Sequence, residues 1–316
     1  MNVSPLPADS IRPSSRPAEH RLRGILLRLI AVIAFSVMAA LVKLLGERGV
    51  GPIELMFYRN LFALPLIIAW LAMGPGILSV RTPRWRAHAT RAGIGMFSMV
   101  LTFQAVLMLP LSVVTTIGFA APLFATVLSS TVLREHVGPH RWAAVAIGFL
   151  GVLVVMRPGG SSDLAPIGLL IGIGSALAIS IVTITVRQIG QTEPATTTVF
   201  WFAMIVVVLG LFVMPFFARN HGAAEWGMLV GMGMIGAVAQ LCMTSSLRFA
   251  PVAALAPFDY TQLLWAILLG WLFFSDGISD QTAAGAVLII ASGLYTVWRE
   301  RKLHIERTPA TPPIQE

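Results

Sequence analysis

An aspartate lies inside one of the most apolar stretches of the chain. Asp259 belongs to the run APFDYTQLLW, residues 256–265, and the sequence stays apolar for several turns beyond it. A charged group in a membrane-spanning helix costs roughly 2.5 kcal/mol or more, so it needs a cavity or a partner. Asp259 is therefore predicted either to contact a substrate amine or to carry a coupling proton. The alternative is a structural carboxylate that pairs with the Tyr260 hydroxyl, a threonine or a lysine.

The run around Asp259 also has a small and polar face. On a helix, this face contains Ala256, Asp259, Gln262, Ala266 and Gly270. Pro257 removes one backbone hydrogen bond just before the aspartate, which is tolerated where helices line water. We therefore expect Asp259, Tyr260 and Gln262 to lie along a substrate pathway.

Two cations also occur within apolar runs. Arg59, in FYRNLFALP, lies well inside its run and has Asn60 beside it. An arginine at this depth needs a partner, for which Glu54 is one candidate, or it clamps an anionic or carbonyl group of a substrate. Lys43 lies near the end of its run, where a lysine can extend its side chain to the membrane surface. Arg59 is therefore the better candidate for the pathway.

Aromatic side chains are suited to holding a planar substrate. Trp201 and Tyr260 could stack on a flat ring, and an aromatic cavity with a few polar groups suits a heterocycle. The alternative for Trp201 is anchoring at the membrane surface or packing within the bundle. These arguments predict a pathway that contains Arg59, Trp201, Asp259, Tyr260 and Gln262, with Asp259 as the candidate for a coupling proton.

Other functional classes lack their signatures in this sequence. The phosphate loop G-x-x-x-x-G-K-[ST], the motif G-x-S-x-G and paired catalytic carboxylates are absent. All six histidines fall in expected tails or connections, and Cys242 is the single cysteine, so neither a metal site nor a disulfide within the chain is predicted. No basic face interleaved with aromatics indicates nucleic acid. We therefore expect no enzymatic activity, no cofactor and no nucleic-acid partner.

Membrane-spanning helices have to position these residues. The 316-residue chain is 56% hydrophobic and 11% charged, with a mean hydropathy of +0.82, which is typical of an integral membrane protein. A bilayer core of about 30 Å needs roughly 20 apolar residues per helix. The apolar runs predict ten helices, at 24–45, 53–73, 90–109, 111–133, 141–156, 165–187, 196–217, 226–247, 252–274 and 281–298.

The basic residues indicate how these helices are oriented. Lys and Arg concentrate in the cytoplasmic segments of membrane proteins. If both termini are cytoplasmic, the outer connections contain Arg48, Arg157 and Arg219, Lys43 and Arg59 lie within helices, and the rest of the 22 basic residues lie inside. The distribution therefore predicts cytoplasmic termini, which agrees with an even number of spans.

The two halves of the chain resemble each other. Alignment of the fourth and ninth predicted helices places Pro110 against Pro251 and Phe119 against Tyr260. Because each half has five spans, an odd number, the second half enters the membrane in the opposite orientation, as in many secondary transporters. The alternative is a chance alignment of two apolar segments. The predicted units are a disordered tail at 1–20, five-helix repeats at 21–158 and 164–302, and a second disordered tail at 303–316.

Several segments resemble those of a known family. FYRNLFALP, TTIGFAAPLFATVL, RWAAVAIGFLGVLVVMRP, TVFWFAM and APFDYTQLLWAILLGWLFF are similar to segments of the drug/metabolite transporter superfamily, in its ten-helix EamA-type branch. The resemblance covers roughly residues 22–302, and the nearest likeness is to the riboflavin or S-adenosylmethionine uptake transporters. It implies a central cavity between the repeats, alternating access, a bacterial inner membrane and a small organic metabolite as substrate.

The resemblance and the pathway residues together give an expected function. We predict a secondary transporter with riboflavin as the preferred substrate, because a flat ring suits an aromatic cavity. Uptake of S-adenosylmethionine, a cation that could use Asp259, and efflux of amino acids or other metabolites are the alternatives. A membrane scaffold or sensor is a further alternative, which predicts no substrate flux and tolerance of Asp259→Ala. The expected partners are the substrate and the bilayer, and faces of small residues also allow a homodimer.

Overall fold

The described part of the chain is helical throughout. The computed structural model describes residues 16–74, 76–132, 134, 137–156, 165–190 and 192–307. Within these ranges it contains no strand and forms twelve α-helices and one short 3₁₀ helix, η1. The elements are α1 (Arg16–Glu47), α2 (Pro52–Met73), η1 (Ile77–Val80), α3 (Trp85–Met108), α4 (Leu111–Gly118), α5 (Ala121–Thr131), α6 (Pro139–Met156), α7 (Pro166–Ile189), α8 (Ala195–Phe217), α9 (Ala223–Ser246), α10 (Val252–Asp259), α11 (Gln262–Phe274) and α12 (Asp280–Arg307).

The twelve α-helices form ten membrane-spanning segments. In the described ranges, nine helical segments are long and apolar enough to span a bilayer, and one of them, Leu111–Thr131, consists of α4 and α5 together. The broken pair α10 and α11 supplies the tenth crossing. The predicted number of spans is therefore confirmed.

Two of the predicted helices are not continuous. The span expected at 111–133 is broken at Phe119, between α4 and α5, and the span expected at 252–274 is broken at Tyr260, between α10 and α11. Pro122 accounts for the first break, because its ring clashes with the carbonyl four residues earlier and supplies no N–H. The rings of Phe119 and Tyr260, which occupy equivalent positions in the two halves, meet edge to face with centroids 5.0 Å apart. The two breaks therefore face each other.

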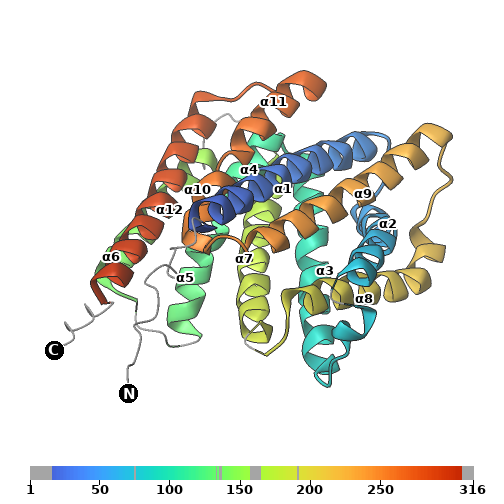
Figure 1. Ribbon diagram of the computed structural model, residues 1–316. Helices are drawn as coiled ribbons and strands as arrows, with labels where there is room; N and C mark the ends of the chain where they lie inside the picture. Colours follow the sequence, from blue (N-terminus) through green and yellow to red (C-terminus); the bar gives the residue numbers. More distant parts are fainter. Residues whose placement is uncertain are drawn as a thin grey trace, which may run out of the picture.

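The two halves pack against each other in a reciprocal way. α1 packs against α9 and α11, and the equivalent helix of the second half, α7, packs against α3 and α5. The last helices of the two halves, α6 and α12, lie side by side at one edge of the bundle (Figure 1). Because five spans reverse the direction of the second half, the fold is an all-α membrane bundle of two inverted five-helix repeats.

The ends of the two repeats stay predictions. α1 begins at Arg16, inside the segment 1–20 that the sequence assigns to a disordered tail. α12 likewise continues to Arg307, inside the expected tail 303–316. The remainder of both expected tails lies outside the described residues.

α6 and α12 touch backbone to backbone at two glycines. A Cβ added at Gly151 of α6 would lie 2.8 Å from the carbonyl oxygen of Gly285, and a Cβ at Gly285 of α12 would lie 2.6 Å from the carbonyl oxygen of Gly151. Both distances are shorter than real Cβ contacts. Neither position has room for a methyl group, and the close approach allows the two helices to pack along their length.

Candidate transport pathway

Asp259 is held by an arginine from the first repeat. Its carboxylate, at the end of α10, receives hydrogen bonds from Arg28 of α1, with Nε 2.5 Å from Oδ1 and Nη2 2.6 Å from Oδ2. The Arg28 side chain is buried, whereas that of Asp259 is 35% exposed. The partner is therefore an arginine, rather than the Tyr260 hydroxyl, threonine or lysine that the sequence suggested. Both carboxylate oxygens are engaged in a bidentate ion pair that joins the two repeats.

Lys43 also pairs with a carboxylate of the second repeat. Its Nζ lies 2.6 Å from Oδ2 of Asp276, in the connection after α11, and 4.6 Å from the centroid of the Phe274 ring. This pairing replaces the extension to the membrane surface that its position suggested. Since Arg28 and Lys43 are about 22 Å apart along the helix, α1 is joined to the second repeat at two levels, at the break between α10 and α11 and after the end of α11.

Arg59 has no carboxylate partner in the described part of the chain. It is 7% exposed and lies in α2. Its Nη1 is 3.4 Å from Oδ1 of Asn60, and its Nε has no hydrogen-bond partner among the described residues. Glu54, the candidate partner, instead accepts a hydrogen bond from the backbone N–H of Arg219 at 3.1 Å and pairs with His221 at 2.7 Å. The suggested pairing of Arg59 with Glu54 is therefore wrong.

A second unpaired arginine lies near Arg59. Arg91 of α3 lies over the ring of Phe202 of α8, with Cζ 4.2 Å from the ring centroid. Its Nε and Nη1 atoms are buried, and neither finds a hydrogen-bond partner within the described ranges. The two arginines lie on helices α2 and α3, which pack against each other. Two neighbouring helices thus each carry a positive charge without a counter-charge from the described chain.

Arg28 and Arg91 were not among the predicted pathway residues. Both were expected in cytoplasmic segments, because each lies close to the expected start of its helix. In the structure α1 begins at Arg16 and α3 at Trp85, several residues earlier than expected, so both arginines lie well inside a helix. Their positions after the start of an apolar run were the signal that could have identified them as charges within the membrane.

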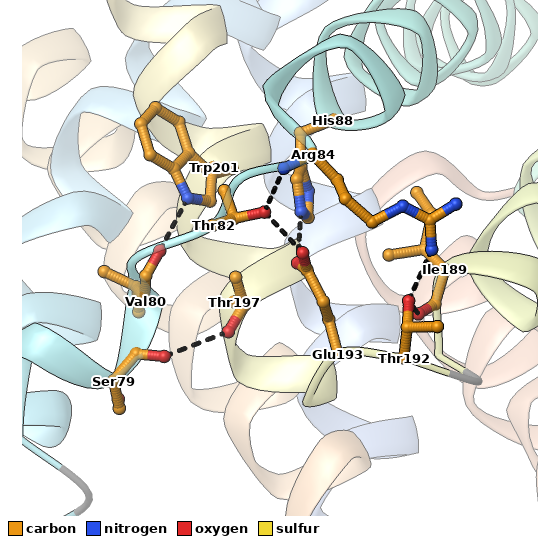
Figure 2. Close-up of polar contacts among 10 residues, drawn as sticks. All are labelled: Ser79, Val80, Thr82, Arg84, His88, Ile189, Thr192, Glu193, Thr197 and Trp201. Carbon is orange, nitrogen blue, oxygen red and sulfur yellow. Dashed lines mark hydrogen bonds and ion pairs between the residues drawn. The ribbon is translucent and has the colours of Figure 1, made fainter.

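Trp201 is bound to the connection between α2 and α3. Its indole N–H donates to the carbonyl oxygen of Val80 at 2.8 Å (Figure 2). With Trp85 its ring lines a groove of about 430 Å³ between α3 and α8, and the 60% exposure of Trp85 shows that this groove opens at the outside of the bundle. α8 also lies well apart from α10 (Figure 1). The structure therefore does not bring Trp201 beside Asp259.

Tyr260 and Gln262 lie at the helix break next to Asp259. The Tyr260 hydroxyl packs against Gly293 of α12, where any Cβ would collide with it. Its ring contacts Phe119 of the first repeat. Gln262 is the first residue of α11 and is half-buried. The break thus brings Asp259, Tyr260 and Gln262 together where the two repeats meet.

A hydrogen-bonded cluster joins the repeats on the N side, which is the membrane side where α1 begins. Glu193, before α8, accepts a hydrogen bond from the Thr82 hydroxyl and pairs with His88 at 2.6 Å, and Arg84 donates to Thr192 at 2.5 Å (Figure 2). Burial alone would raise the pKa of the Glu193 carboxyl, but the hydrogen bonds and the charges of His88 and Arg84 lower it. His88 was expected in a connection, but it lies in the first turn of α3 and is 1% exposed.

A second histidine–glutamate cluster joins the repeats on the far side, where α2 begins. His221, in the connection before α9, lies 2.7 Å from Glu54 of α2 and 3.0 Å from Glu225 of α9. Burial alone would lower the pKa of His221, but hydrogen bonds to the two carboxylates and their negative charges raise it. Each side of the bundle is thus held by a histidine from one repeat and a glutamate from the other.

Two inverted repeats, with ion pairs and helix breaks where they meet, define a membrane transporter rather than an enzyme. The sequence profile of the EamA-like transporter family matches residues 22–157 and 166–298. The chain belongs to this family.

This chain matches curated relatives that are named transporters over nearly their whole length. The riboflavin transporter of Vibrio cholerae is 26% identical over 92% of this chain and 98% of its own, and that of Rhizobium johnstonii is 30% identical over 91% and 94%. The S-adenosylmethionine uptake transporter of Rickettsia prowazekii is 24% identical over 89% and 94%. A solved structure, titled only as the crystal structure of a protein, has a TM-score of 0.61 at 18% identity and covers 89% of this chain and 98% of that one. At this identity the structural likeness supports the fold alone.

Proposed function

We propose that this chain takes up riboflavin across a bacterial inner membrane by alternating access. The observation that carries the proposal is the contact between Phe119 and Tyr260, which places two aromatic rings where the repeats meet, beside the polar groups of Asp259 and Gln262. A flat ring with polar edges suits such surroundings. The relatives named riboflavin transporters support the same substrate.

The two histidine–glutamate clusters supply the alternation in this proposal. We take the N side as cytoplasmic, with both termini there, because the basic residues concentrate on that side. A substrate between the repeats leaves to the cytoplasm when the contact of His88 with Glu193 opens. It enters from outside when the contact of His221 with Glu54 opens. One contact holds while the other opens, because the repeats rock against each other around the fixed site.

A growth assay tests the substrate. A riboflavin-auxotrophic bacterium that lacks its own uptake system would express the chain and grow on limiting riboflavin. We expect rescue, and we expect import of labelled riboflavin to saturate with concentration. Absence of both, with the protein shown to be in the membrane, would contradict the proposal.

S-adenosylmethionine uptake is the second candidate, because curated relatives carry that name. A cationic substrate needs a free carboxylate, and both oxygens of Asp259 already receive hydrogen bonds from Arg28. This engagement favours riboflavin, which is neutral. Import of labelled S-adenosylmethionine into the same cells, with riboflavin as the competitor, distinguishes the two candidates.

A further inference from the structure

Arg59 and Arg91 lie at the depth where transporters bind their substrates. Arg59 is about 10 Å along α2 from the far side, and Arg91 is about 9 Å along α3 from the N side. In a bilayer core of about 30 Å, each position lies within reach of the midplane for a side chain as long as that of arginine. The surrounding side chains come from both repeats, since Asn60 lies on α2 and Phe202 on α8. Substrate sites of inverted-repeat transporters lie at this depth, between the repeats.

The described carboxylates in and around the bundle interior are already engaged by other cations. Asp259 is bound to Arg28 and Asp276 to Lys43. Glu54 and Glu193 pair with histidines near the two membrane sides. No described acidic side chain therefore neutralises the two arginines, and their burial without a counter-charge is unfavourable.

The two guanidinium groups have unused donors, and each packs against a glycine of a neighbouring turn or helix. Arginine carries five N–H donors and no acceptor, and the unpaired atoms are Nε of Arg59 together with Nε and Nη1 of Arg91. Gly236 of α9 stands against Arg59, where an added Cβ would be 3.2 Å from Nε, and Gly95 of α3 stands against Arg91, where a Cβ would be 3.4 Å from Nη1. A ligand for this place must therefore offer acceptor atoms, and a planar pair of oxygens matches the fork of an arginine.

We propose that Arg59 and Arg91 form a binding site for a planar substrate group with two acceptor oxygens. Two chemical sources offer two such oxygens: a carboxylate, whose oxygens share one carbon and fit the fork of one arginine, and the pyrimidinedione ring of a flavin, whose two carbonyls flank an N–H and would each accept from a different arginine. The inference rests on the proposed transport function and adds to it the edge of the substrate that the protein recognises. Arg59 was already a candidate for the pathway, and Arg91 is new to it.

Binding of three tricyclic probes of similar size to purified protein in nanodiscs tests this site. Phenazine has no oxygen, phenazine-1-carboxylate adds a carboxylate, and lumichrome carries the two carbonyls of the flavin ring. We expect at least one of the oxygen-bearing probes to bind about tenfold or more tightly than phenazine, since charge-assisted hydrogen bonds are lost without oxygens. Arg59→Gln and Arg91→Gln should each remove most of that difference. Arg86→Gln, at an exposed position of the same helix α3, should keep it.

The outcomes separate the site from the proposed substrate. Preference for the carboxylate probe alone, lost in both variants, would support the site and argue against riboflavin. Preference for lumichrome, lost in both variants, would support both. Equal binding of the three probes, or a preference that survives both substitutions, would overturn the site, whereas riboflavin uptake in cells would still decide the substrate. If Arg91→Gln does not fold, Arg91→Lys keeps the charge but removes the planar fork, and it should reduce the preference in the same direction.

Discussion

Substitution of Asp259 by asparagine distinguishes a carboxylate that holds helices from one that handles substrate or protons. The change removes the charge and leaves Arg28 buried without its bidentate partner. Breaking a fully buried pair in this way costs about 3–5 kcal/mol. Because the Asp259 side chain is 35% exposed, solvent screens part of the interaction, and we expect a loss of about 2 kcal/mol in the free energy of unfolding.

The double variant Arg28→Gln/Asp259→Asn provides the matched comparison. It removes both charges, so it should recover most of the stability that the single substitution loses. The assay is denaturant unfolding of the purified protein, followed by uptake in proteoliposomes with and without a pH gradient. If the pair is structural, the double variant transports and keeps its response to the gradient. A single variant as stable as the wild type but unable to transport would refute this reasoning, and it would make Asp259 a proton or substrate group.

Two further predictions concern helix packing and pH. Gly285→Ala places a methyl group 2.6 Å from the carbonyl oxygen of Gly151, about 0.8 Å inside ordinary contact, so α6 and α12 must separate. We expect the free energy of unfolding to fall by about 1–3 kcal/mol. The control Gly231→Ala, whose methyl group meets nothing within 4 Å, should be neutral or stabilising, and equal stability of the two variants would contradict the close contact. The contact of His221 with Glu54 favours protonated histidine, whose pKa is raised in the folded state, so its stabilisation is complete below a pH of about 6.5 and is lost as pH rises through the folded value. Melting temperatures measured across this range should therefore fall with rising pH in the wild type and change less in His221→Gln, and parallel curves would argue against the contact.

The membrane-spanning segments could be predicted from the sequence, because an apolar run long enough to cross a bilayer rarely forms any other structure. The helix breaks could not, although Pro122 is a local signal for the break at Phe119. The ion pairs could not be predicted, because Arg28 and Asp259 are 231 residues apart in the sequence and only the folded chain brings them together. Arg91 was missed for a simpler reason: α3 begins at Trp85, earlier than its hydropathy suggests, because the first turn of a spanning helix is often polar.

The two ion pairs of α1 bear on which parts of the molecule move together. α1 belongs to the first repeat in sequence, yet Arg28 and Lys43 fasten it to Asp259 and Asp276 of the second, and it also packs along α9. α7 makes the reciprocal exchange with α3 and α5. The leading helix of each repeat is therefore bound to the other repeat, and we expect α1 to move with the helices of the second repeat and α7 with those of the first. Cross-links between α1 and α9 should leave transport intact. Cross-links between α1 and the helices that pack with α7 should stop it.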